Sequence, residues 1–88
     1  MITPEQCRAA RGLLGWTQQV LANKAEVGVV TLRQFELRQK TPRRASLHMI
    51  QQTLEKGGVQ FFGGDSAGGV GVRFTKDGTP GLKEPPQF

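Results

Sequence analysis

Residues 15–37 read GWTQQVLANKAEVGVVTLRQFEL, and this stretch determines the expected fold. Thr17 is a suitable N-cap for a short helix over residues 18–24. The apolar side of that helix consists of Val20, Leu21 and Ala25. A break at residues 25–28 leads to a second helix, from Val29 to about residue 37. Its buried positions are Leu32 and Phe35. The stretch therefore predicts two short helices joined by a tight connection.

Another short helix is expected before this stretch. Thr3 fits its N-cap, Pro4 fits its first position, and Gln6 stands where a side chain closes a capping box. Gly15 supplies the stop signal. The apolar positions recur every three or four residues, at Cys7, Ala10 and Leu14. This spacing predicts an amphipathic helix that packs one face against the others.

A fourth helix and two short strands complete the predicted elements. The helix follows Thr41-Pro42 and stops at Gly57-Gly58. Its apolar stripe consists of Leu47, Ile50 and Leu54. Residues 59–62 and 70–74 are short apolar runs, typical of strands, and a glycine-rich link joins them. The predicted fold class is mainly α, a bundle of four to five helices with a short C-terminal β-hairpin.

Charge and glycine content divide the chain near residue 58. Residues 1–58 hold nine Lys or Arg and four Asp or Glu, whereas residues 59–88 hold three of each kind. We therefore expect a basic helical domain over residues 1–58, a hairpin appendage over 59–75 and a flexible tail over 76–88. A lone hairpin is marginal in water. It can serve as a dimer contact, as a docking edge for a partner protein, or as a lid over the fourth helix.

The inventory of reactive side chains argues against catalysis and bound cofactors. The 88 residues include one cysteine, Cys7, and one histidine, His48, which are too few for a zinc site or a disulfide. Cys7 is expected to be a buried apolar residue and His48 a surface packing residue. The glycines of residues 63–71 match no phosphate-binding loop. No segment approaches the roughly 20 apolar residues of a membrane helix. We expect a cytoplasmic protein with no enzymatic activity, cofactor or metal, and no membrane contact.

The net charge of +5 suits a polyanionic partner, and the arrangement of helices is that of a helix-turn-helix. At this point the chain resembles a known family over about residues 3–58. The matching positions are Arg11, Leu14-Gly15-Trp16-Thr17-Gln18, Leu21-Ala22, Ala25, Val27, Thr31-Leu32, Phe35-Glu36 and Thr41-Pro42. They resemble the lambda-repressor-like, Cro-type helix-turn-helix domain of the XRE family. The resemblance implies a bacterial or phage transcriptional regulator, such as a repressor, that binds inverted-repeat operators as a homodimer.

The resemblance also implies which residues bind double-stranded DNA. The third helix would lie in the major groove. Its base-reading positions are Gly28, Val29, Val30, Thr31, Arg33 and Gln34. Arginine can bind guanine, glutamine can bind adenine, and valine methyls can meet a thymine methyl. Gln18 matches a position that anchors a phosphate or an outer base. The phosphate-contacting cations would be Arg33, Arg38, Lys40, Arg43 and Arg44. An ion pair between Arg11 and Glu36 would fix the angle of the third helix without touching DNA.

Several positions depart from the family pattern and leave alternatives open. Glu26 replaces the usual turn glycine, so it would need a left-handed or rearranged turn. Gly28 replaces a Ser or Thr cap, and Arg38 stands where a C-terminal glycine is common. Val29 and Val30 are apolar for base-reading positions, so an alternative function is a protein-interaction module, antitoxin-like or anti-activator. A third alternative, nonspecific DNA coating, predicts equal affinity for scrambled DNA.

Overall fold

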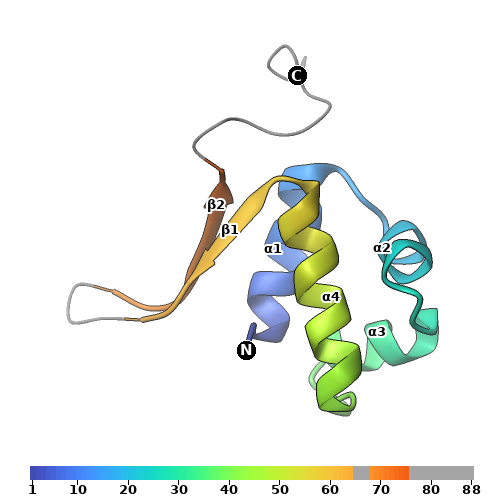
Figure 1. Ribbon diagram of the computed structural model, residues 1–88. Helices are drawn as coiled ribbons and strands as arrows, with labels where there is room; N and C mark the ends of the chain where they lie inside the picture. The colour runs from blue at the N-terminus through green and yellow to red at the C-terminus, as the bar shows by residue number, and fades with distance from the viewer. Residues whose placement is uncertain (65–67, 76–88) are drawn as a thin grey trace.

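The computed structural model describes residues 1–64 and 68–75, which form four helices and one antiparallel hairpin (Figure 1). The elements are α1 (Pro4–Leu14), α2 (Gln18–Ala25), α3 (Val29–Glu36), α4 (Arg44–Gly57), β1 (Val59–Phe62) and β2 (Gly71–Phe74). The chain is thus mainly helical with a C-terminal hairpin, as the sequence predicts. The tail expected over residues 76–88 lies outside the described residues, as do residues 65–67 of the hairpin link.

The predicted signals set both ends of α1 and the start of α2, whereas α4 begins at Arg44, two residues after Pro42. The Thr3 hydroxyl accepts the Gln6 N–H at 3.1 Å, and the Gln6 side chain accepts the Thr3 N–H at 2.9 Å, which is the expected capping box. Thr17 caps α2 by accepting the Val20 N–H at 3.1 Å. Helix α2 extends one residue beyond the prediction, and α3 ends at Glu36, one residue before it. The second strand begins at Gly71 rather than at residue 70.

The core lies where the four helices meet, and it extends into the hairpin. In Figure 1, α1 and α4 stand side by side, with α2 and α3 on one side of α4 and the hairpin on the other side of the pair. The fully buried side chains with the largest volumes are Leu21, Leu32, Ile50, Leu54, Glu36, Val59 and Cys7. Val59 belongs to β1, and Phe61 and Val72 also pack against the core. The hairpin therefore completes the core over α1 and α4.

Gln6 joins the hairpin to the first helix. Its side-chain amide donates to the Phe62 carbonyl at 3.1 Å and to the Gly71 carbonyl at 2.9 Å, while its oxygen serves the capping box. Phe62 and Gly71 face each other in the antiparallel register. A Cβ at position 71 would lie 2.4 Å from the Phe62 ring, so any larger residue there would require that ring to move. One buried side chain thus both starts α1 and holds the two strands.

None of the helices in the described residues is long and apolar enough to cross a membrane.

We predict that Gln6→Glu weakens the hairpin while leaving the capping box intact, because glutamate still accepts the Thr3 N–H. The new carboxylate would face two carbonyl oxygens without a donor, which costs about 2–3 kcal/mol of unfolding free energy. Urea unfolding measures the loss, and hydrogen exchange of the β1 and β2 amides locates it. Gln52→Glu, the same change at an exposed position of α4, is the matched control. Equal urea midpoints for the two variants would show that the Gln6 amide does not hold the hairpin.

Candidate nucleic-acid interface

The connection between α2 and α3 is a three-residue turn, residues 26–28. Glu26 has φ 58° and lies in the left-handed region. This is one of the two conformations expected where glutamate replaces the usual turn glycine. The Glu26 N–H donates to the Asn23 carbonyl at 3.3 Å and the Val27 N–H to the Ala22 carbonyl at 3.0 Å. These bonds satisfy the last carbonyls of α2. The tight turn places α3 against α2 and turns one side of α3 outward.

Arg38 has the same backbone conformation at the end of α3. Its φ is 59°. The Arg38 N–H donates to the Phe35 carbonyl at 3.0 Å, and the Gln39 N–H donates to the Gln34 carbonyl at 2.8 Å. A non-glycine residue in the left-handed region costs about 1 kcal/mol or more. Position 38 is therefore a left-handed helix end occupied by arginine, and it directs residues 39–43 back toward the start of α4.

The outward side of α3 carries most of the predicted base-reading residues. Val30 and Arg33 are exposed, and Thr31 and Gln34 are half-buried. Gly28 is exposed at the N-cap. Val29, in contrast, is half-buried and packs against the hydrophobic core. Part of the Val29 side chain is therefore used in packing, unlike that of the exposed Val30.

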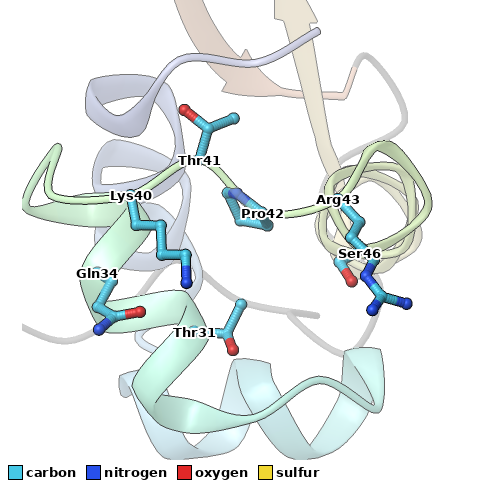
Figure 2. Close-up of a pocket in the computed structure, with 7 residues that line it drawn as sticks. All are labelled: Thr31, Gln34, Lys40, Thr41, Pro42, Arg43 and Ser46. Atoms are coloured by element: carbon cyan, nitrogen blue, oxygen red, sulfur yellow. The ribbon is translucent and has the colours of Figure 1, made fainter.

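A groove of about 330 Å³ lies between α3 and the segment that leads into α4. It is lined by Thr31, Gln34, Lys40, Thr41, Pro42, Arg43 and Ser46. Figure 2 shows Thr31 and Gln34 on α3, Lys40 reaching toward them, and Arg43 and Ser46 on the opposite wall. Two predicted base-reading residues and two predicted phosphate contacts thus meet in one concave surface.

The cations predicted to contact phosphate have different surroundings. Arg33, Lys40, Arg43 and Arg44 are all exposed. Arg38 is also exposed, but its guanidinium binds the Glu5 carboxylate through two bonds of 2.8 and 2.5 Å. Those bonds hold the pKa of Glu5 well below its ordinary value. Arg38 is thus paired with a carboxylate of the same chain. Arg44 follows Arg43 but is not among the residues that line the groove.

The first turn of α4 adds positive potential next to these side chains. Arg43 is the N-cap, and its side chain makes no cap hydrogen bond to any described residue. The first N–H groups of a helix have no partner within the helix, and the helix dipole makes this end positive. Because Lys40 and Arg43 both line the groove beside this helix end, the groove favours an anion.

Arg11 and Glu36 form an ion pair between α1 and α3, the pair that the resemblance implies. The guanidinium donates to both carboxylate oxygens at 2.7 Å, and the Glu36 side chain is 1% exposed. The Cys7 thiol donates to one oxygen at 3.2 Å and the Gln18 amide to the other at 3.1 Å. Arg8 also donates to the Glu36 backbone carbonyl. The Gln18 side chain, expected at a phosphate or base, is thus engaged with Glu36.

These hydrogen bonds keep Glu36 ionised although it is buried. Burial alone would raise its pKa, but the bonds from Arg11, Gln18 and Cys7 outweigh that effect and hold the pKa below the ordinary value. The same contact raises the pKa of Arg11. Burial, together with the adjacent Glu36 charge, raises the pKa of the Cys7 thiol, so this thiol stays protonated and unreactive.

The described residues contain no group of three or more side chains suited to hold a metal ion. Cys7 is fully buried and His48 is exposed on α4, the positions expected for them.

Sequence reasoning missed three residues of the groove, Thr41, Pro42 and Ser46. Thr41-Pro42 indicated a helix start and matched the family pattern, but neither signal places these residues beside α3. Ser46 stands at the third position of α4, where a hydroxyl beside two arginines was an available signal. Its place opposite Thr31 depends on how α3 and α4 pack, which no local pattern encodes.

No protein-family model matches the chain, and no curated protein matches it.

We predict that Glu36→Ala strongly destabilises the fold. Removing one member of a buried ion pair leaves the other uncompensated and typically costs about 3–5 kcal/mol, a large part of the stability of a small domain. Urea unfolding followed by circular dichroism measures this loss. Glu5→Ala breaks the exposed pair with Arg38 and serves as the control, for which we expect little change because water and salt screen that pair. An unchanged midpoint for Glu36→Ala would mean that the pair does not stabilise the fold.

The lowered pKa of Glu36 predicts acid sensitivity. A carboxylate whose folded pKa lies below its unfolded value binds fewer protons when folded, so its contribution is complete above the ordinary value of 4.5. That contribution is lost as the pH falls through the folded pKa. At high salt, we expect the wild-type melting temperature to be constant from about pH 5 to 7 and to decline below about pH 4.5. Under the same conditions, the decline should be shallower in Glu36→Gln. Parallel curves for wild type and Glu36→Gln would assign the acid sensitivity to other groups.

Proposed function

We propose that this protein is a sequence-specific regulator of transcription that binds double-stranded DNA through a lambda-repressor-like helix-turn-helix, with α3 in the major groove. The observation that carries the proposal is the groove in which Thr31 and Gln34 of α3 meet Lys40 and Arg43 of the following segment. A surface that joins hydrogen-bonding side chains on a helix to cations beside that helix suits base edges and the adjacent phosphates together.

The exposed positions of α3 divide by chemistry. Arg33 suits the two acceptors of guanine, and Gln34 suits the acceptor and donor of adenine. Lys40 and Arg43 belong to the segment leading into α4 and line the groove beside Thr31 and Gln34, and the uncapped first turn of α4 follows Arg43. In this proposal α3 reads the base sequence, and Lys40, Arg43 and the first turn of α4 bind the DNA backbone.

The buried ion pair supports this reading surface from behind. Glu36 is the last residue of α3, Arg11 lies on α1 and Gln18 opens α2. Because these side chains converge on one carboxylate, the three helices are fixed relative to one another. A helix that reads bases must hold its side chains to within a fraction of an ångström. Arg11, Glu36 and Gln18 are therefore positioning residues in this proposal and do not contact DNA.

We further propose that the protein binds inverted repeats as a homodimer, with the hairpin as the association surface. The base of the hairpin packs on the core, while Phe62 is 42% and Val70 is 49% exposed. Unpaired strand edges and exposed apolar residues favour contact with a second chain. The hairpin thus serves both as a cover over α1 and α4 and as the edge that a partner meets.

One observation favours a second candidate function, that of a protein-interaction module. Val30 of α3 and Leu37, just after the end of that helix, lie seven residues apart and are 55% and 57% exposed. Apolar residues at this spacing also suit a groove on a partner protein. Salt-sensitive binding to one DNA sequence separates the two functions, because the second requires none.

Selection from a random duplex library with the purified protein tests the proposed function directly. We expect an enriched palindrome with a fixed half-site spacing, because a two-fold dimer imposes its symmetry on the site. Enrichment of single half-sites would remove the dimer. No enrichment, together with no affinity for any duplex at low salt, would remove DNA binding.

We predict that two variants separate base reading from phosphate contact. Gln34→Ala should relax the preference at one operator position by about 1–3 kcal/mol and leave the salt dependence nearly intact. Arg43→Ala should weaken binding to operator and scrambled duplex together and reduce the salt slope by about one ion per subunit. Fluorescence anisotropy at several salt concentrations measures both effects. Lys56→Ala, an exposed cation at the far end of α4, is the control and should change neither. Indistinguishable profiles for the first two variants would contradict these roles.

A further inference from the structure

An exposed valine stands among hydrogen-bonding residues on the outward side of α3. Val30 is 55% exposed, whereas the neighbouring Val29 packs against the core. Arg33 and Gln34 follow one turn later on the same side, and Thr31 borders the groove next to it. The chain thus presents a methyl-bearing side chain, without donor or acceptor, at the start of the helix that the proposed function places in the major groove.

The surroundings of Val30 leave room for close contact. Gly28, two residues earlier, is exposed, and a Cβ built there would meet only the Thr31 hydroxyl, at 3.6 Å. Because residue 28 is a glycine, no side chain there separates the start of α3 from an approaching base edge.

The chemistry of the major groove limits what an apolar side chain can recognise there. Donors and acceptors line most of the groove, and the 5-methyl group of thymine is the apolar group that unmodified base pairs display in it. Pressing Val30 against a donor or acceptor would remove water from that group without replacing its hydrogen bond. Contact with a methyl carries no such cost and buries apolar surface on both partners.

We infer that Val30 recognises a thymine through its 5-methyl group, and that this thymine lies one to two base pairs from the purine read by Arg33 or Gln34. This inference rests on the proposed DNA-binding function. The spacing follows from the helix: three or four residues advance about 4.5–6 Å along its axis, against about 3.4 Å per base-pair step. Val30 is therefore a specificity-determining residue of the half-site.

Deoxyuridine substitution tests this contact, because it removes only the 5-methyl group. Each thymine of one half-site of the selected operator is replaced in turn, and affinities are measured by fluorescence anisotropy for wild type and Val30→Ala. At one position we expect wild type to lose about fourfold in affinity, the worth of one buried methyl. Val30→Ala should bind the thymine and deoxyuridine forms equally, since the methyl has lost its partner. Val30 is exposed, so the variant should keep the wild-type melting temperature.

Leu37→Ala is the matched control, because Leu37 is equally exposed but lies two turns further along, just after the end of α3. It should retain the fourfold effect at the same thymine. The inference is overturned if no deoxyuridine position affects wild type, if Val30→Ala keeps the effect, or if the enriched half-site has no thymine near the purine. In each of these cases an enriched operator still upholds DNA binding. Absence of any enriched sequence, with no duplex affinity at low salt, overturns the proposed function as well.

Discussion

A single buried carboxylate, that of Glu36, is the constraint on which the arrangement of the helices depends. It is 1% exposed and accepts two bonds from Arg11, one from Gln18 and one from Cys7. A buried charge without such partners would cost more than a small core can offset. Because the donors come from α1 and α2, movement of either helix relative to α3 would remove hydrogen bonds from that charge.

Polar side chains with two roles connect the parts of this small fold. Gln6 closes the capping box of α1 and also donates to both strands of the hairpin. Arg8, also on α1, donates to the backbone carbonyl of Glu36, the last residue of α3. A chain of this length buries only roughly two-thirds of its unfolded surface, so such bonds supply orientation that a larger core would provide by packing. The hairpin belongs to this network through Gln6, and its Val59 side chain is also buried in the core.

Two backbone conformations set the positions of α3 and of the segment that follows it. Glu26 and Arg38 both adopt left-handed conformations, one before α3 and one after it. The first turn brings α3 against α2, and the second sends residues 39–43 past Thr31 and Gln34. These two left-handed residues, one on each side of α3 in the chain, set the position of that helix at a cost in backbone strain.

The sequence by itself determined the local structure: the caps at Thr3 and Thr17, the helix end at Gly15, the two strands and the buried stripe of Leu47, Ile50 and Leu54. These features depend on residues within a few positions of one another, so a linear pattern contains them. The resemblance supplied the Arg11–Glu36 pair, but not the engagement of Gln18 and Cys7 with it. Only the tertiary structure decided that Val29 packs partly against the core, that Arg38 binds Glu5, that Gln6 holds the hairpin and that Ser46 and Thr31 line one groove. Each of these depends on how separate elements pack, and packing brings together side chains that are distant along the chain.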